Sequence, residues 1–145
     1  MLFRSPLKKP EGVKDLIDFL MSKATPANEW ELDQDDATTL SPEERVEEVV
    51  REKLYRFLHQ ELPYEIRQTN RLFRVVKRQD ESLVVEAHQD LVVRTKSHKE
   101  MICGRGNRTL EHIRSAAVRD LEVIFGCPVE LLLHVKHSKS RNWTI

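Results

Sequence analysis

The chain has 145 residues, of which 39% are hydrophobic and 33% charged, and its 24 Lys and Arg balance its 24 Asp and Glu. This composition is typical of a soluble globular protein with one domain of about 100 residues and an appendage, and no apolar run approaches the ~20 residues of a membrane-spanning helix. The spacing of Cys103 and Cys127 fits neither a disulfide framework nor a metal site, so we expect no metal. We also expect no cofactor, and the lack of a long apolar run predicts no membrane partner.

The neutral total conceals a gradient of charge along the chain. Residues 1–48 carry 6 Lys and Arg against 12 Asp and Glu, residues 49–93 carry 8 against 7, and residues 94–145 carry 10 against 5. Such asymmetry says more about binding partners than the total charge does. The basic C-terminal third favours an anionic partner.

Two segments precede the first strong helix signal. Residues 12–22 predict a short amphipathic helix, because their apolar side chains recur at helical spacing. From residue 25 to residue 40 polar and acidic residues predominate, which predicts an acidic linker. We expect Trp30 in this linker to contact a neighbouring protein surface rather than to stack on a base.

Ser41-Pro42-Glu43-Glu44 predicts the start of a longer helix. Ser41 suits the N-cap, Pro42 suits the first helical position, and Glu44 completes a capping box. We expect this helix to run to about Gln60, because Pro63 follows soon after. Its apolar face consists of Val46, Val49, Val50, Leu54, Phe57 and Leu58.

Two strands are predicted next, at residues 64–77 and 83–93, with a polar turn at 79–82 between them. The second strand ends in the apolar run Leu91-Val92-Val93, which is typical of a central strand. We expect Ser97 to cap a short helix that ends at Cys103.

A long amphipathic helix to about Phe125 and a last strand at residues 129–135 complete the pattern, with Gly126 just past the helix end. Because two helices connect the second and third strands, these strands should be parallel. The predicted fold is α+β, with a three-stranded mixed sheet and helices on one of its faces.

Between the last two helices lies the loop Gly104-Arg105-Gly106-Asn107, followed by Arg108. Glycine can adopt positive φ, and a helix that begins after such a loop directs its free N–H groups and its positive dipole end toward it. These features suit an anion, either a nucleotide phosphate or a nucleic-acid backbone. The loop lacks the Lys-Ser/Thr of a P-loop and the third glycine of a dinucleotide fingerprint. Taken alone, it could equally be a simple turn between helices.

The context of the loop resembles a KH domain, in which a Gly-x-x-Gly loop between two helices clamps four nucleotides. The additional helix and strand in front match the type II variant of that fold. Three stretches resemble the C-terminal KH domain of the Era family of GTPases, as does the ending from Val129 to Lys136 with a tryptophan in the tail. These stretches are REKLYRFL at 51–58, ELPY at 61–64 and RDLE at 119–122.

This resemblance implies a domain organisation. A remnant of the last helix of a GTPase domain would occupy residues 1–24, the linker 25–40, the type II KH domain 41–137 and a basic tail 138–145. Residues 12–40 would then contact a GTPase domain. The chain contains no P-loop, guanine motif or switch, so we expect no enzymatic activity from it. It would be the C-terminal piece of a longer GTPase or a descendant that has lost the catalytic half.

The resemblance also implies a function. Proteins of this family bind the 3′ end of small-subunit ribosomal RNA and assist assembly of that subunit, so the expected partners are single-stranded ribosomal RNA and small-subunit proteins. The expected compartment is the mitochondrial matrix, with the bacterial cytoplasm as the alternative. The alternative function is a KH module for protein–protein docking in a ribonucleoprotein. The residues expected to bind RNA are Lys99, Ile102, Gly104, Arg105, Gly106, Asn107, Arg108 and His112.

Several of these residues carry a second interpretation. Asn107 replaces the last glycine of the family's loop, and because Asn tolerates the left-handed conformation we expect the turn to survive. Its side chain could still crowd a nucleotide backbone. Ile102 could line a base pocket or belong to the core. Along the long helix Arg108, His112, Ser115 and Arg119 form one stripe, which could bind RNA or be solvated, and Arg119 could pair with Glu122.

Overall fold

The computed structural model describes residues 11–25 and 38–138, and the chain divides into two units, Met1–Thr39 and Leu40–Ile145. In the first unit, helix α1 spans Glu11–Lys23, as its apolar spacing predicted. Its side chains Val13, Ile17 and Leu20 are each about half exposed, at 45%, 53% and 56%. No helix in 11–25 or 38–138 is both long and apolar enough to cross a bilayer. Trp30 and most of the predicted linker lie outside the described residues.

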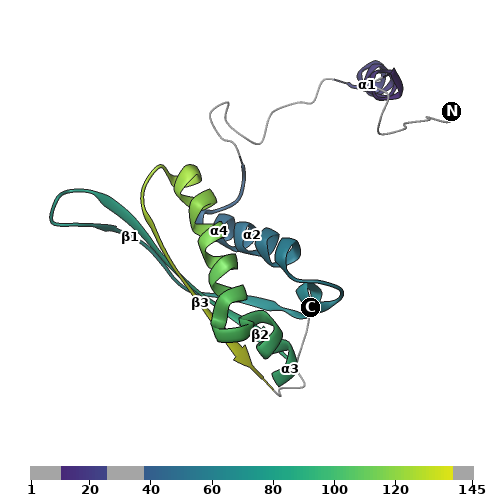
Figure 1. Ribbon diagram of the computed structural model, residues 1–145. Coiled ribbons are helices and arrows are strands. Elements are labelled where there is room, and N and C mark those ends of the chain that lie inside the picture. The colour runs from purple at the N-terminus through teal and green to yellow at the C-terminus, as the bar shows by residue number, and fades with distance from the viewer. Residues whose placement is uncertain (1–10, 26–37, 139–145) are drawn as a thin grey trace. The chain divides into compact units, whose positions relative to one another are not determined.

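The second unit is a three-stranded sheet with helices against one face (Figure 1). The strand order is β1-β2-β3, β1 and β2 are antiparallel, and β2 and β3 are parallel. The predicted α+β fold with a mixed sheet is therefore confirmed. In chain order the elements are α2 (Pro42–Phe57), the 3-10 helix η1 (Leu62–Glu65), β1 (Arg67–Lys77), β2 (Leu83–Val93), α3 (Lys96–Cys103), the 3-10 turn η2 (Arg105–Asn107), α4 (Arg108–Phe125) and β3 (Val129–His137).

Ser41 and Glu44 form the predicted capping box at the start of α2, but three other predicted boundaries are wrong. Helix α2 ends at Phe57 rather than near Gln60. The first strand begins at Arg67 rather than at residue 64, because Leu62–Glu65 forms a 3-10 turn that buries Leu62 and Pro63. Tyr64 alone favours a strand, but its N–H donates to the Glu61 carbonyl oxygen at 3.1 Å, which closes the turn.

The third correction concerns the start of α3. Thr95, not Ser97, is the N-cap residue, and its Oγ1 accepts a hydrogen bond from the His98 N–H at 3.0 Å. Both residues carry the hydroxyl that an N-cap needs. Thr95 takes the position because its backbone is still extended where it follows β2, at φ −123° and ψ 152°.

The core lies between the sheet and the helices. Alternate residues of β3 face the helices and are buried, whereas the residues between them face the other side. Each fully buried Leu, Ile or Val side chain contributes roughly 1.5–3 kcal/mol to folding. The buried residues that hold α3 and α4 to β2 and β3 are Leu91, Val93, Ile102, Ile113, Ala117, Leu121, Val129, Leu131, Leu133 and Val135.

Strands β1 and β2 continue beyond Val129, the first residue of β3, as a two-stranded arm. Pairing of β2 with β3 starts at Val85, while β1 and β2 stay paired as far as Lys77 and Leu83. The turn between them closes with the Arg78 N–H donating to the Ser82 carbonyl oxygen at 2.8 Å. Figure 1 shows this arm extending past the helices, so the helices leave it uncovered.

Candidate nucleic-acid interface

Gly104 ends α3 and redirects the chain toward α4. Its φ of +68° and ψ of 178° lie in a region that is essentially restricted to glycine. Its N–H donates to the Glu100 carbonyl oxygen at 2.8 Å, which closes the last turn of α3. A Cβ at this position would overlap the side chain of Thr109 in the first turn of α4. Gly104 is therefore required both by its backbone conformation and by the space around it.

The rest of the loop is a tight left-handed turn. Gly106 has φ 63° and ψ 34°, and Asn107 has φ 61° and ψ 16°, so both lie in the left-handed region. The Asn107 N–H donates to the Gly104 carbonyl oxygen at 3.2 Å. The expectation that asparagine preserves the turn in place of glycine is confirmed.

Helix α4 begins differently from the two helices before it. Helices α2 and α3 are capped by the side chains of Ser41 and Thr95, whereas no side chain caps α4 at Asn107. The first amides of a helix and its positive dipole end attract anions when no side chain satisfies them. The start of α4, with exposed Arg105 and Arg108 beside it, therefore suits a phosphate.

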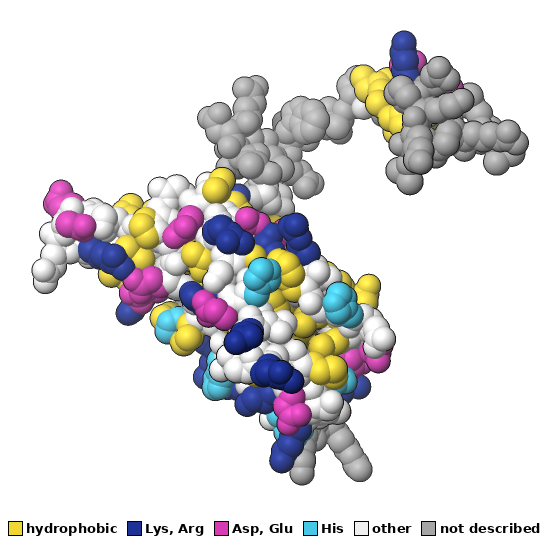
Figure 2. All heavy atoms as spheres, in the orientation of Figure 1, with side chains coloured by type: hydrophobic (Ala, Val, Ile, Leu, Met, Phe, Trp, Pro, Cys, Tyr) yellow, Lys and Arg dark blue, Asp and Glu magenta, His cyan; other side chains and the backbone are white. Residues whose placement is uncertain are grey.

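A groove of about 670 Å³ lies between α3 and β3 and reaches Gly104 at the start of the loop. Three of its lining residues are lysines and one is a glutamate, so its charge is net positive. Figure 2 shows dark blue side chains gathered over α3 and the start of α4. The groove is lined by Lys96, Lys99, Glu100, Cys103, Gly104, His134, Val135, Lys136 and His137.

The structure brings most of the predicted RNA-binding residues to this place. Lys99 and Gly104 line the groove, and the loop residues 105–108 are exposed at its end. Ile102 is different, because it is 0% exposed and belongs to the core. Its proposed role in a base pocket is therefore corrected, and it supports the loop from inside the domain.

His112 is exposed but does not line the groove. Its ring lies edge-to-face on Phe57, with the ring centroids 4.5 Å apart at an angle of 81°. This contact joins α4 to α2. Glu122, the alternative partner considered for Arg119, instead lies 3.5 Å from the Val129 N–H.

Sequence reasoning missed the contribution of β3 to the groove. His134, Val135, Lys136 and His137 form one wall of it. The alternation of the last strand indicated which side chains leave the core, but the groove also requires that β3 be an edge strand beside α3. The connection of β2 to β3 through two helices places β3 beside α3, so the predicted topology could have indicated that β3 contributes to the groove.

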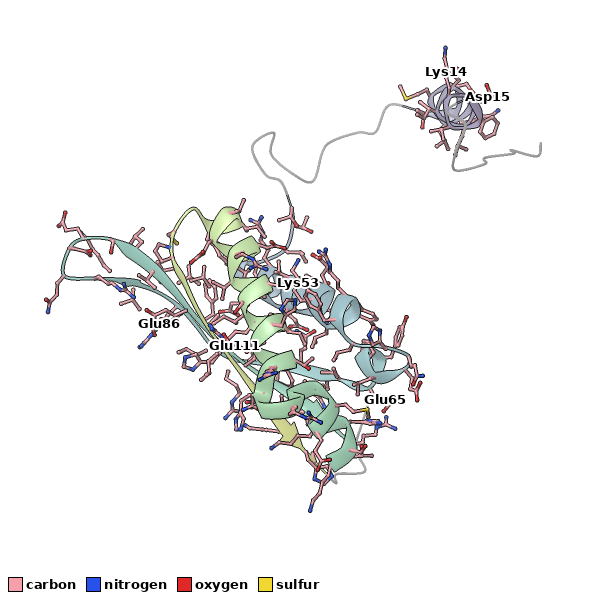
Figure 3. All side chains as sticks on the ribbon, viewed as in Figure 1. Lys14, Asp15, Lys53, Glu65, Glu86 and Glu111 are labelled. Atoms are coloured by element: carbon pink, nitrogen blue, oxygen red, sulfur yellow. The ribbon has the colours of Figure 1, made fainter. Side chains whose placement is uncertain are left out.

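A buried lysine fixes α4 against α2. The Lys53 side chain is 4% exposed and forms ion pairs with Asp120 of α4 and with Glu52, and Figure 3 shows it between the two helices. Burial pushes the pKa of Lys53 down, but its hydrogen bonds to Asp120 and Glu52 outweigh burial and raise the pKa above 10.5. This pair anchors α4, the helix that follows the loop.

The α-β-β-α-α-β order, the glycine loop and the lysine-lined groove define a KH-type nucleic-acid-binding domain. A family model described as "KH domain" matches residues 46–140. The chain therefore belongs to the KH domain family, and its resemblance to the C-terminal domain of Era is confirmed.

Similar curated proteins are GTPases named Era. The chain is 33% identical to the GTPase Era of Erythrobacter litoralis, over 87% of this chain and 40% of that protein. It is 32% identical to GTPase Era of Rickettsia bellii, over 94% of this chain and 44% of that protein. The chain thus spans about two fifths of the length of these curated relatives.

Two solved structures share the fold at 25% identity, each over 87% of this chain and 41% of the other. One is an Aquifex aeolicus Era variant bound to GDP.AlF4-, with a TM-score of 0.72. The other is Era in complex with MgGDPNP and nucleotides 1506–1542 of 16S ribosomal RNA, with a TM-score of 0.74.

Proposed function

We propose that this chain binds single-stranded RNA in the groove between α3, the loop 104–107 and β3. The observation that carries this proposal is a lysine-lined groove that ends at a left-handed glycine loop and an uncapped helix start. Protein docking, the alternative, has no comparable support, because the groove carries three lysines against one glutamate and therefore attracts an anionic polymer. The solved complex of Era with a ribosomal RNA segment supports RNA as the ligand.

The two halves of the site have different tasks in this proposal. The first turn of α4 with its positive dipole end, together with Arg105 and Arg108, holds phosphates. Bases enter the groove, and Lys99 of α3 and Lys136 of β3, on its opposite walls, neutralise the phosphates of the nucleotides bound there. Backbone contacts fix the position of the RNA strand, and groove contacts with the unstacked bases give sequence preference.

The finer proposal is that the RNA is the 3′ end of small-subunit ribosomal RNA and that binding assists assembly of that subunit. Its support is the 16S ribosomal RNA segment bound by Era, a protein similar to this chain. The chain matches only about two fifths of its GTPase relatives, so we assign it the RNA-binding task and no GTP hydrolysis.

The test is a charge reversal at the loop, Arg105→Glu with Arg108→Glu. Replacing two phosphate-binding cations by anions should weaken binding of a ribosomal RNA 3′-end oligonucleotide by roughly tenfold or more at 50 mM salt. Fluorescence anisotropy measures the dissociation constant. The matched control, Lys14→Glu with Lys23→Glu on α1, changes the charge equally and should leave the affinity unchanged. Equal affinities for the loop variant and the parent would refute the proposal.

A further inference from the structure

The sheet face that turns away from the helices carries charged side chains that are arranged in rows. The strand register aligns side chains on this face into rows that cross β1, β2 and β3. From the groove end outward, the rows are Arg67, Val92 and Lys136, then Thr69, Asp90 and His134, then Leu72, His88 and Leu132, then Arg74, Glu86 and Glu130.

The two ends of this face differ in charge. At the hairpin end Arg74 pairs with Glu86 at 2.6 Å and Arg78 pairs with Glu130, so each of these cations is matched by a carboxylate. Figure 3 shows Glu86 toward the hairpin arm, away from α3. At the other end the cations Arg67 and Lys136 share a row that has no acidic member. Positive potential therefore concentrates at the end of the face that borders the groove.

One buried carboxylate organises this basic end. The Asp90 side chain is 9% exposed and lies 2.6 Å from Lys136 Nζ and 3.3 Å from Arg71 Nε. His134 Nδ1 lies 3.8 Å from the same carboxylate. Arg71 lies at the irregularity of β1 between Asn70 and Leu72. One negative charge holds two permanent positive charges in fixed positions, so the cluster remains net positive.

This basic end is continuous with the groove. His134 and Lys136 line the groove and also belong to the rows on the open face, because β3 is the edge strand between the two surfaces. Their side chains are 64% and 40% exposed. A polymer that leaves the groove across β3 would therefore meet Lys136 first and then Arg71 and Arg67 of β1.

We propose that the open sheet face bearing Arg67, Arg71, His134 and Lys136 is a second binding surface for the phosphates of the RNA strand that leaves the groove. This inference rests on the proposed function. A phosphate backbone fits this surface better than an apolar protein segment, because its basic end holds three permanent cations against the single carboxylate of Asp90. Among the described residues Leu132 is the exposed large hydrophobic on this face, and it lies in the third row.

The test uses two RNAs, one of five nucleotides that can fill the groove alone and one of twelve that can also cross β3. In Arg67→Gln with Arg71→Gln, affinity for the long RNA should fall about threefold for each phosphate that is no longer neutralised, and the log–log salt slope should fall by ~0.7 per phosphate. Affinity for the short RNA should not change, since neither arginine lines the groove. The matched control is Arg74→Gln with Arg78→Gln, which should leave both affinities unchanged.

The outcomes separate the two proposals. Suppose that the short RNA binds the parent and that the variant with both Arg67 and Arg71 replaced keeps full affinity for the long RNA. The open face then does not bind RNA, whereas the proposal that the groove binds RNA is unaffected. Equal weakening for both RNAs also overturns the second binding surface, because the variant would then act through the groove. If neither RNA binds the parent, the proposed function itself fails. Because Arg71 also contacts Asp90, the single variant Arg67→Gln, in which no ion pair among the described residues is broken, repeats the test without that change.

Discussion

Gly104 and Gly106 both have positive φ, but they differ in ψ and in the space around them, so the two glycines have different roles. Gly104 needs its missing side chain because Thr109 occupies the space beside it, whereas a Cβ on Gly106 would meet nothing within 4 Å. The sequence predicted a glycine turn and a tolerant asparagine correctly, since both follow from local backbone preferences. It could not decide between core and pocket for Ile102, because burial of that side chain depends on strands far away in the chain.

This difference predicts unequal costs for two identical substitutions. Gly106→Ala should lower the free energy of unfolding by about 1–2 kcal/mol, the usual cost of a left-handed non-glycine residue. Gly104→Ala should cost more than that, because overlap with Thr109 adds to the backbone strain. Urea unfolding of the two variants against the parent measures both values. Equal costs would mean that Thr109 moves aside freely and that Gly104 is required only for its backbone conformation.

At the scale of elements, helix α2 shows which features the apolar repeat of a helix can predict and which it cannot. Its start and its apolar face were predicted, because a capping box and a 3.6-residue repeat are local signals. The same repeat did not indicate that Lys53 on α2 is buried against Asp120 of α4. The two residues are 67 positions apart, so nothing in either local sequence indicates the pair.

The pair should respond unequally to removal of its two members. Asp120→Ala leaves a buried ammonium with only Glu52 and should destabilise the fold by roughly 1–3 kcal/mol. Lys53→Met should cost less than that, because the Asp120 side chain is 48% exposed and can be hydrated. Guanidinium unfolding at pH 7 compares the two variants. A larger destabilisation for Lys53→Met would show that the lysine is held mainly by packing of its aliphatic stem.

The same pair has a pH dependence whose sign follows from the raised pKa of Lys53. A raised pKa in the folded state means that the pair's contribution is complete below the unfolded value of 10.5 and is lost as pH rises through the higher folded value. The stability difference between the parent and Lys53→Met should therefore be constant from about pH 7 to 10 and shrink above that range. Urea unfolding of both proteins across this range measures the difference, and a difference that shrinks already below pH 9 would contradict the raised pKa.

At the scale of the whole molecule, the formal charge is zero, yet the chain carries a distinctly basic surface. The charge gradient along the sequence indicated where cations concentrate. It did not predict that residues of α3 and β3 would share one groove, which depends on the parallel pairing of β3 with β2. The topology thus brings cations from separate segments of the basic C-terminal third together in one groove.

If this groove is where the RNA backbone is neutralised, its lysines should account for part of the salt dependence of binding. Lys99→Gln with Lys136→Gln should lower the slope of log affinity against log salt by ~1.4, about 0.7 for each single-stranded phosphate that is no longer neutralised. The matched variant Lys14→Gln with Lys23→Gln, on α1, removes the same charge from the same molecule. An equal fall in slope for both variants would mean that net charge alone, and not the groove between α3 and β3, attracts the RNA.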